Sequence, residues 1–160
     1  APALPSLVVG SRIAAGMAAE LGSMTVTEQV DAIRALGADP IRRLVVPRIT
    51  ASVLTLPLIA CFALVFGLSA AVLIGWLNYA IAPADFIGGA LEALSMEDYL
   101  SGLSKTPIFG FLIALLGCHF GLTTRGGTEG VGRATTRAVV VVSITVLISD
   151  ALLTQIFVMF

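Results

Sequence analysis

The feature that most limits how this chain can fold is a long stretch without any charged side chain, residues 49–77. A helix needs about 20 consecutive apolar residues to cross the hydrocarbon core of a bilayer. The stretch is longer than one crossing requires, so we expect the helix to tilt, bend or protrude. Pro57, Gly67 and Gly75 offer places to bend. The stretch predicts a transmembrane helix.

The composition leads to the same conclusion. Hydrophobic residues make up 58% of the chain and charged residues only 12%, whereas soluble domains typically carry about 25% charged residues. Too little polar surface remains to cover a globule in water, so part of the surface must face lipid. The net charge of −1 gives no basic field of the kind that attracts nucleic acid. Cys61 and Cys118 each lie in an apolar run, and we expect neither a disulfide nor a metal site.

Two further apolar segments are long enough to cross a membrane, residues 106–124 and residues 138–160. A weaker candidate, residues 4–21, is rich in Ala and Gly and contains Arg12, so it should pack inside the protein and not against lipid. The predicted fold class is therefore all-α, a polytopic helical membrane protein with four transmembrane helices. We treat residues 1–160 as one domain.

The orientation of these helices follows from the basic residues between them, because cytoplasmic loops carry an excess of Lys and Arg. The segments 23–48 and 123–137 hold most of the basic residues, whereas the segment 78–104 has acidic side chains and no basic one. We therefore predict that segments 23–48 and 123–137 are cytoplasmic and that segment 78–104 lies on the outer side. The basic residues concerned are Arg34, Arg42, Arg43, Arg48, Arg125, Arg133 and Arg137.

The first cytoplasmic segment has the pattern of a short amphipathic helix. Thr25 followed by Glu28 fits a capping box, in which each side chain satisfies a free backbone N–H. Val26, Val30 and Ile33 fall on one helical stripe. The pattern predicts a helix that begins at the capping box and buries this stripe.

The rest of the segment supplies an end to this helix and a new beginning. Asp31 and Arg34 have the spacing of an i,i+3 ion pair, and Gly37 can end the helix in the left-handed conformation. Asp39 and Pro40 then fit the N-cap and first residue of the next helix. A short helix between two membrane spans can rest on lipid headgroups or dock in a groove of a partner protein. Its partly acidic polar face argues against anionic lipid.

Several motifs in and around this segment resemble the signature of MlaE (YrbE) type ABC transporter permeases. They are SR at 11–12, AAELGSM at 18–24, VTEQVDA at 26–32, LGADP at 36–40 and LVVPR at 44–48. A further match, GVGRATTRAVV at 130–140, precedes the last apolar run. The resemblance covers essentially the whole chain. The family's N-terminal elbow helix and first transmembrane helix are absent from it, so we expect this to be the C-terminal portion of a permease domain.

The resemblance implies a homodimeric, non-catalytic permease subunit in the bacterial inner membrane, with segment 78–104 in the periplasm. It implies phospholipid transport between membranes, serving outer-membrane lipid asymmetry or lipid import. Cytoplasmic ATPase subunits would bind ATP and Mg, so no cofactor is expected in this chain, and an MCE-domain lipid-binding protein would sit on the outer side. The short helix would be the coupling helix that seats in the ATPase. The coupling residues would be Thr25, Thr27, Glu28, Gln29, Asp31, Ala32 and Arg34.

Ionisable residues within membrane segments are costly and invite functional hypotheses, although structural ion pairs are the commoner explanation. From their spacing we predict that Asp150 is satisfied between helices by Arg12 or by a nearby Ser or Thr. Lys105 lies at the outer end of its span and has two interpretations. It can be a lysine that snorkels to the interface, or an ammonium group that meets a lipid phosphate. The resemblance favours the second, since the family carries a lysine at the matching place.

Other chemistries find little support. The glycines of segment 126–132 have neither the lysine nor the preceding strand of a phosphate-binding loop, so they predict a tight turn, and we do not expect this chain to hydrolyse ATP. The single histidine, His119, has no carboxylate near it in sequence and no metal-ligand spacing. The remaining alternatives are an ion-coupled secondary transporter or channel that uses Arg12, Lys105 or Asp150 as a relay, and a structural membrane subunit.

Overall fold

The computed structural model describes residues 3–93 and 95–159, and the fold there is helical throughout. The α-helices are α1 (Ala3–Val26), α2 (Gln29–Ala35), α3 (Val46–Tyr79), α4 (Pro83–Ala93), α5 (Met96–Leu122) and α6 (Gly127–Met159). A short π-helical turn, η1 (Ile41–Val45), leads into α3. The predicted class, a polytopic helical membrane protein, is confirmed.

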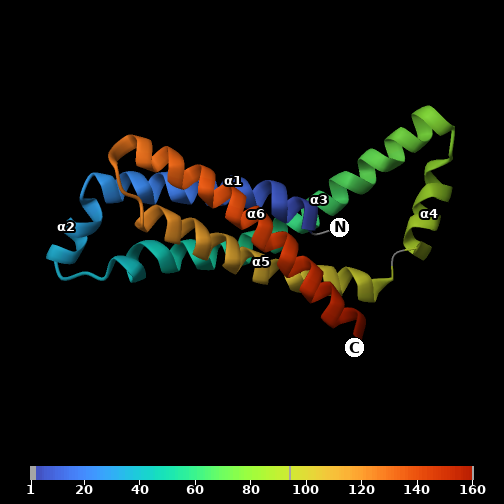
Figure 1. Cartoon of the computed structure of the whole chain (residues 1–160). Coiled ribbons are helices and arrows are strands. Elements are labelled where there is room, and N and C mark those ends of the chain that lie inside the picture. The colour runs from blue at the N-terminus through green and yellow to red at the C-terminus, as the bar shows by residue number, and fades with distance from the viewer. Residues whose placement is uncertain (1–2, 94, 160) are drawn as a thin grey trace.

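The long helices α1, α5 and α6 lie side by side together with the first half of α3, and α2 projects from one end of this bundle (Figure 1). The second half of α3 diverges from the bundle, and α4 returns the chain from its tip toward the start of α5 (Figure 1). This divergence agrees with burial, since the residues of α3 that are buried are Ser52, Leu56 and, far along the helix, Gly75.

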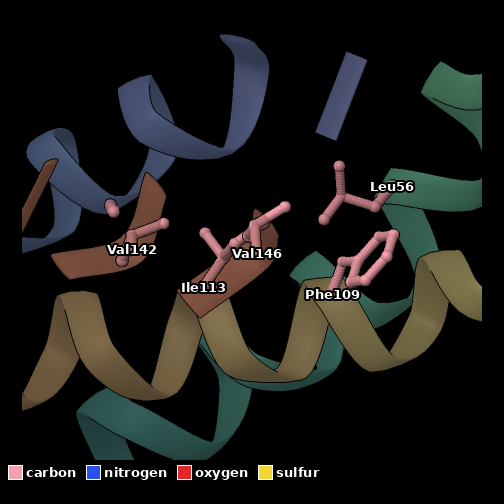
Figure 2. Packing of buried hydrophobic residues seen from close by; sticks show 6 residues of the cluster. Leu56, Phe109, Ile113, Val142 and Val146 are labelled. Carbon is pink, nitrogen blue, oxygen red and sulfur yellow. The ribbon is translucent and has the colours of Figure 1, made fainter. Parts of the chain in front are cut away.

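The core of the bundle is an apolar cluster to which four helices contribute. Its buried members are Ala14, Leu56, Phe109, Ile113, Val142 and Val146, and Figure 2 shows Phe109 and Leu56 facing each other beside Ile113 and the two valines. In lipid, helices associate through close packing and not through the exclusion of water. The interfaces should therefore be built around small residues.

Glycines on α5 provide that close packing. A Cβ at Gly110 would lie only 2.7 Å from the backbone oxygen of Ser52, so α5 and α3 touch backbone to backbone there. A Cβ at Gly117 would lie 3.1 Å from Cα of Ala14 on α1. The small-residue segment predicted to pack inside the protein thus does so along one face of α1, which is a stripe of Ser6, Gly10, Ala14, Ala18, Leu21 and Gly22.

The number of membrane spans is only partly confirmed. Three helical segments are long and apolar enough to cross a membrane, Ile41–Tyr79, Met96–Leu122 and Gly127–Met159. The fourth predicted span lies within α1, a helix of 24 residues that packs against α5 and α6 but is less apolar than the other three segments. Its charges, Arg12 and Glu20, lie on the exposed side of the helix, away from the packed stripe.

The helices extend well beyond the apolar runs from which they were predicted. α5 begins at Met96, where Ser95 accepts a hydrogen bond from the backbone N–H of Asp98, and not near residue 106. α6 begins at Gly127, so most of the segment predicted as the loop 123–137 is helical. The segment 78–104 also contains α4, which sequence reasoning missed. Hydropathy detects the part of a helix that lies in lipid, whereas helices continue into the polar interface wherever caps permit.

Candidate functional site

The predicted coupling residues lie at one end of the bundle, on and just before α2. Thr27, Glu28, Gln29, Asp31, Ala32 and Arg34 are exposed. Val30 is the buried residue of α2, and the predicted Asp31–Arg34 ion pair is confirmed with a distance of 3.5 Å. α2 thus attaches to α1 through its apolar side and turns its polar side outward.

The predicted capping box is wrong. The Thr25 hydroxyl belongs to the end of α1, where it donates to the backbone oxygen of Leu21 at 2.7 Å and approaches that of Gly121 on α5 at 3.3 Å. α2 begins only after Glu28, which adopts the left-handed conformation with φ 60° and provides no side-chain cap. A threonine hydroxyl can bond backward to the carbonyl four residues earlier, and here that bond competes with capping. Thr25 therefore fixes α1 to α5 and does not start α2.

The end of α2 matches the prediction. Gly37 has φ 75°, and the following N–H of Ala38 donates to the backbone oxygen of Ile33 at 3.2 Å, as in a glycine-terminated helix. Asp39 then accepts a hydrogen bond from the backbone N–H of Ile41 at 3.0 Å, which caps the next helix. Directly before Gly37, Leu36 is 85% exposed, so the end of α2 presents an apolar side chain.

An ion pair that sequence reasoning missed closes the base of this segment. Arg48 at the start of α3 donates to the carboxylate of Glu20 near the end of α1 at a distance of 2.7 Å. We call this pair the clasp. The two residues are 28 positions apart, and no local pattern connects them. The clasp joins the two helices that enter and leave this segment, α1 and α3.

At the opposite part of the bundle, Lys105 does not snorkel to the interface. It is 7% exposed, and its ammonium group donates to the Thr154 hydroxyl at 2.9 Å and lies 5.4 Å from the centre of the Phe157 ring. No carboxylate lies within ion-pair distance in the part of the chain that the structure describes. Lys105 is thus a buried cation held between α5 and α6 by a hydroxyl and an aromatic ring.

The predicted pairing of Asp150 and Arg12 does not form within the described residues. Arg12 is exposed on the outer face of α1, and Asp150 is half-buried on α6, where its backbone oxygen accepts a hydrogen bond from the Thr154 hydroxyl at 2.6 Å. Neither side chain has an ion-pair partner among residues 3–93 and 95–159. The packing of α1 explains the error, because its stripe of small residues faces α5 and α6 and turns Arg12 away from Asp150.

A cavity of about 620 Å³ opens where α3 diverges from the bundle. Its walls are formed by the second half of α3, by α4 and by the first turns of α5, with Pro5 of α1 beside them. The lining is almost entirely apolar or small and consists of Ala60, Ala63, Leu64, Gly67, Leu68, Ala71, Phe86, Ala90, Ala93, Gly102 and Leu103, with Asp98 and Tyr99 as its polar members. We call this the wedge cavity. The wedge cavity is lined by residues of a single chain.

Two contacts hold the walls of the wedge cavity. Phe86 of α4 packs over Gly75 of α3, where a Cβ would lie 3.3 Å from the ring. Cys61 of α3 and the Tyr99 hydroxyl of α5 are 3.3 Å apart and share a hydrogen bond. These two contacts join α3 to α4 and to α5. These features define the class of the protein. It is a helical membrane protein in which a polar segment projects from one end of the bundle and an apolar cavity lies toward the other end.

Comparison with known proteins identifies the family. The family described as "Permease MlaE" matches residues 1–156, and the chain belongs to it. A "probable ABC transporter permease protein" of Rickettsia prowazekii is 40% identical over 98% of this chain and 60% of its own length. One of Synechocystis is 41% identical over 94% of this chain and 57% of its own length. The chloroplastic protein TRIGALACTOSYLDIACYLGLYCEROL 1 of Arabidopsis thaliana is 39% identical over 98% of the chain and 45% of its own length. This chain thus spans about 60% of the length of the first two relatives.

Proposed function

We propose that this chain belongs to the permease subunit of an ABC transporter that moves phospholipids between membranes. The observation that carries the proposal is the segment of α2, a short helix that projects from the end of the bundle. Six of the predicted coupling residues are exposed on α2 and just before it, and Leu36 is exposed at its end. A rigid helix with this surface suits a groove in a partner protein. The names of the bacterial relatives support an ABC transporter, in which the partner is the ATPase.

The clasp gives the docked helix a way to act on the membrane part. When the ATPase subunits close around ATP and Mg, they would displace α2, and the Glu20–Arg48 pair would pass that displacement to α1 and α3. α3 begins beside this pair and is 34 residues long, or about 51 Å, and its residues from Ala60 to Ala71 form a wall of the wedge cavity. A change at the coupling end would therefore alter the cavity near the other end.

The wedge cavity fits the acyl chains of a lipid. Its apolar lining provides hydrocarbon-like walls, and its polar members are few, as expected for a site that orients a mostly apolar ligand. Lys105 follows Gly102 and Leu103 of this lining on α5 but does not itself line the cavity, since its ammonium group is held by Thr154 and Phe157 of α6. We assign this ammonium group to the phosphate of the lipid headgroup. The name of the Arabidopsis relative, which contains that of a diacylglycerol lipid, favours a lipid substrate.

The assembly we propose contains a second copy of this chain, two ATPase subunits and an MCE-domain protein on the outer side, in a bacterial inner membrane. The exposed face of α1 is available for contact with a helix of another subunit. Leu4, Val8, Arg12, Gly16 and Glu20 are exposed along it at four-residue spacing, although α1 is packed on its other face. In this assembly the chain itself performs no catalysis.

Charge reversal on α2 tests the ATPase contact. In a full-length permease expressed with its ATPase, Glu28→Arg combined with Asp31→Arg should reduce the amount of ATPase that co-purifies at least tenfold. The matched control reverses Asp85 and Glu92, two exposed carboxylates on α4 at the opposite end. Normal recovery of the ATPase with the α2 variant would refute the proposal. Lipid transport driven by a proton gradient without ATP would support the ion-coupled alternative.

A further inference from the structure

A second cavity lies at the same end of the bundle as α2, in the turn between α5 and α6. Its volume is about 230 Å³, and its lining includes the three arginines Arg125, Arg133 and Arg137 together with Thr123 and Thr124. We call it the basic cup. The proposed transport cycle uses none of these residues. The cup is also separate from Lys105 and from the wedge cavity.

The turn that forms the cup is tightly built. Gly126 and Gly127 have φ of 93° and 67°, a conformation that side chains rarely adopt, and they reverse the chain directly after Arg125. A Cβ at Gly130 would overlap the backbone oxygen of Arg125, so the first turn of α6 is pressed against the arginine's own backbone. The Arg133 guanidinium reaches back over the turn, 3.4 Å from where a Cβ of Gly126 would stand. Arg125 and Arg133 are thus brought together by the fold.

The positive charge of the cup is poorly compensated. The ion pair recorded there joins Arg133 to Glu129 at 3.7 Å, and both side chains are mostly exposed, so this pair is weak. Arg125 and Arg137 have no carboxylate within ion-pair distance in the described part of the chain. The hydroxyls of Thr123 and Thr124 already donate to the backbone oxygens of His119 and Phe120, at 2.7 and 2.9 Å. The free donors that face the cavity are therefore guanidinium groups.

Guanidinium groups bind oxyanions through paired N–H donors, a geometry that matches phosphate as well as carboxylate, and a phosphate has enough oxygens to meet more than one arginine. The N-terminal end of α6, a 33-residue helix, adds a favourable dipole at the same place. We infer that the basic cup binds a phosphate group, supplied by the headgroup of an anionic lipid in the leaflet at the α2 end.

The depth of the cup in the membrane favours a lipid phosphate. Arg137 directly precedes a run without charge that continues to Asp150, so the cup opens where the hydrocarbon begins. Basic pockets between transmembrane helices at this level are suited to anionic lipid headgroups. The cup also adjoins the coupling end, because a Cβ at Gly22 of α1 would lie 3.0 Å from the Thr124 hydroxyl. A lipid held there would sit beside the end of α1.

The test measures lipid retention by the full-length protein. It is purified from nanodiscs of phosphatidylcholine containing a minor fraction of phosphatidylglycerol, and the retained lipids are counted by native mass spectrometry. Arg133→Gln combined with Arg137→Gln should reduce phosphatidylglycerol retention about 30-fold, since each arginine near the surface contributes roughly a factor of five. The matched control is Arg42→Gln with Arg43→Gln, two exposed arginines of η1 that do not line the cup.

Equal losses in the cup and control variants would overturn the inference, because a general attraction of basic residues to the membrane would then be sufficient. Retention unchanged in both would overturn it as well. A repeat in millimolar inorganic phosphate separates the two sources of the ligand: displacement of the lipid assigns the cup to soluble phosphate, and persistence assigns it to the headgroup. Loss of a partner subunit without loss of lipid would refute phosphate binding in favour of an acidic protein surface. Arg125→Gln provides a second variant outside α6 if the double variant does not fold.

Discussion

At Lys105 the chain places an ammonium group inside the helix bundle with a hydroxyl and an aromatic ring as its partners. A buried charge without a counterion costs stability, and a protein that needed only a packed core would do better with an apolar residue of similar shape. The cost is understandable if an anion completes the site during transport. Replacing Lys105 should therefore have different effects on the stability of the protein and on its transport activity, and both can be measured.

The first prediction is that Lys105→Met leaves the thermal stability of the purified permease unchanged or raises it, and reduces ATP-driven phospholipid transport at least tenfold. The thioether side chain fills the same space without a charge, so packing between α5 and α6 is kept. Melting curves and transport in proteoliposomes measure the two effects. Thr154→Val is the companion variant, because it removes the hydrogen bond to Lys105 and keeps the charge, and it should reduce transport less. Full transport by Lys105→Met would show that the lysine is structural.

A second prediction concerns Gly110, where α5 meets the backbone of α3. Gly110→Ala should lower the stability of the purified protein by about 1–3 kcal/mol, as overpacking in tight interfaces does, because the added Cβ would meet the Ser52 backbone at 2.7 Å. Gly88→Ala on α4 is the control, since nothing lies within 4 Å of its Cβ position. Thermal unfolding in detergent should place Gly110→Ala below the wild type and Gly88→Ala at or above it. Equal stabilities would mean that α3 and α5 can separate without cost.

Among the elements, α2 and the two helices that it connects show what a sequence can and cannot predict. The existence of α2, its end at Gly37 and the cap at Asp39 follow from local rules, and the structure confirms them. The predicted start of α2 was wrong, because the Thr25 hydroxyl donates to a backbone oxygen of α1 and approaches one of α5. That choice depends on a tertiary contact, which a local motif cannot include.

The same limit applies to the clasp and to the wedge cavity. Glu20 and Arg48 were visible as charges, but the pairing depends on how α1 and α3 cross. α4 escaped prediction because it is short and only moderately apolar, and the cavity follows from the divergence of α3, which no pattern in the run 49–77 reveals. The sequence thus predicted three membrane spans and the short helix α2, while contacts between distant residues came from the structure alone.

The clasp supports a third prediction. Glu20→Arg should weaken the link between ATP hydrolysis and lipid transport, because it places two cations where a close ion pair stood. In the reconstituted complex, we expect ATP hydrolysis to continue while transport falls about fivefold or more. The exchanged double variant, Glu20→Arg with Arg48→Glu, should recover most of the transport. Failure of the exchange to recover it would indicate that Arg48 has another role, and normal transport by Glu20→Arg would show that the clasp is dispensable.

Over the whole molecule, α3 is the element that reaches from the coupling segment to the wedge cavity. It is tied to the bundle at Ser52 and Leu56, and beyond them its next buried residue is Gly75, under Phe86 of α4. The section between these points extends away from the bundle (Figure 1), and its residues are exposed or only partly buried. A helix held at one end and loosely covered at the other can move as a lever, so a small displacement at η1 becomes a larger one at the cavity wall.

The fourth prediction follows from this arrangement, because a lever changes transport only if the space beside it holds the lipid. Ala63→Trp places an indole in the wedge cavity and should lower both the number of phospholipids retained by the purified permease and its transport rate, with transport reduced at least fivefold. Val65→Trp is the matched control on the same helix, since Val65 is 62% exposed and does not line the cavity. Co-purification of the ATPase should be equal in both variants, because the coupling segment is untouched. Normal lipid retention and transport in Ala63→Trp would place the lipid path outside this chain's own wedge, against the face that α1 leaves exposed.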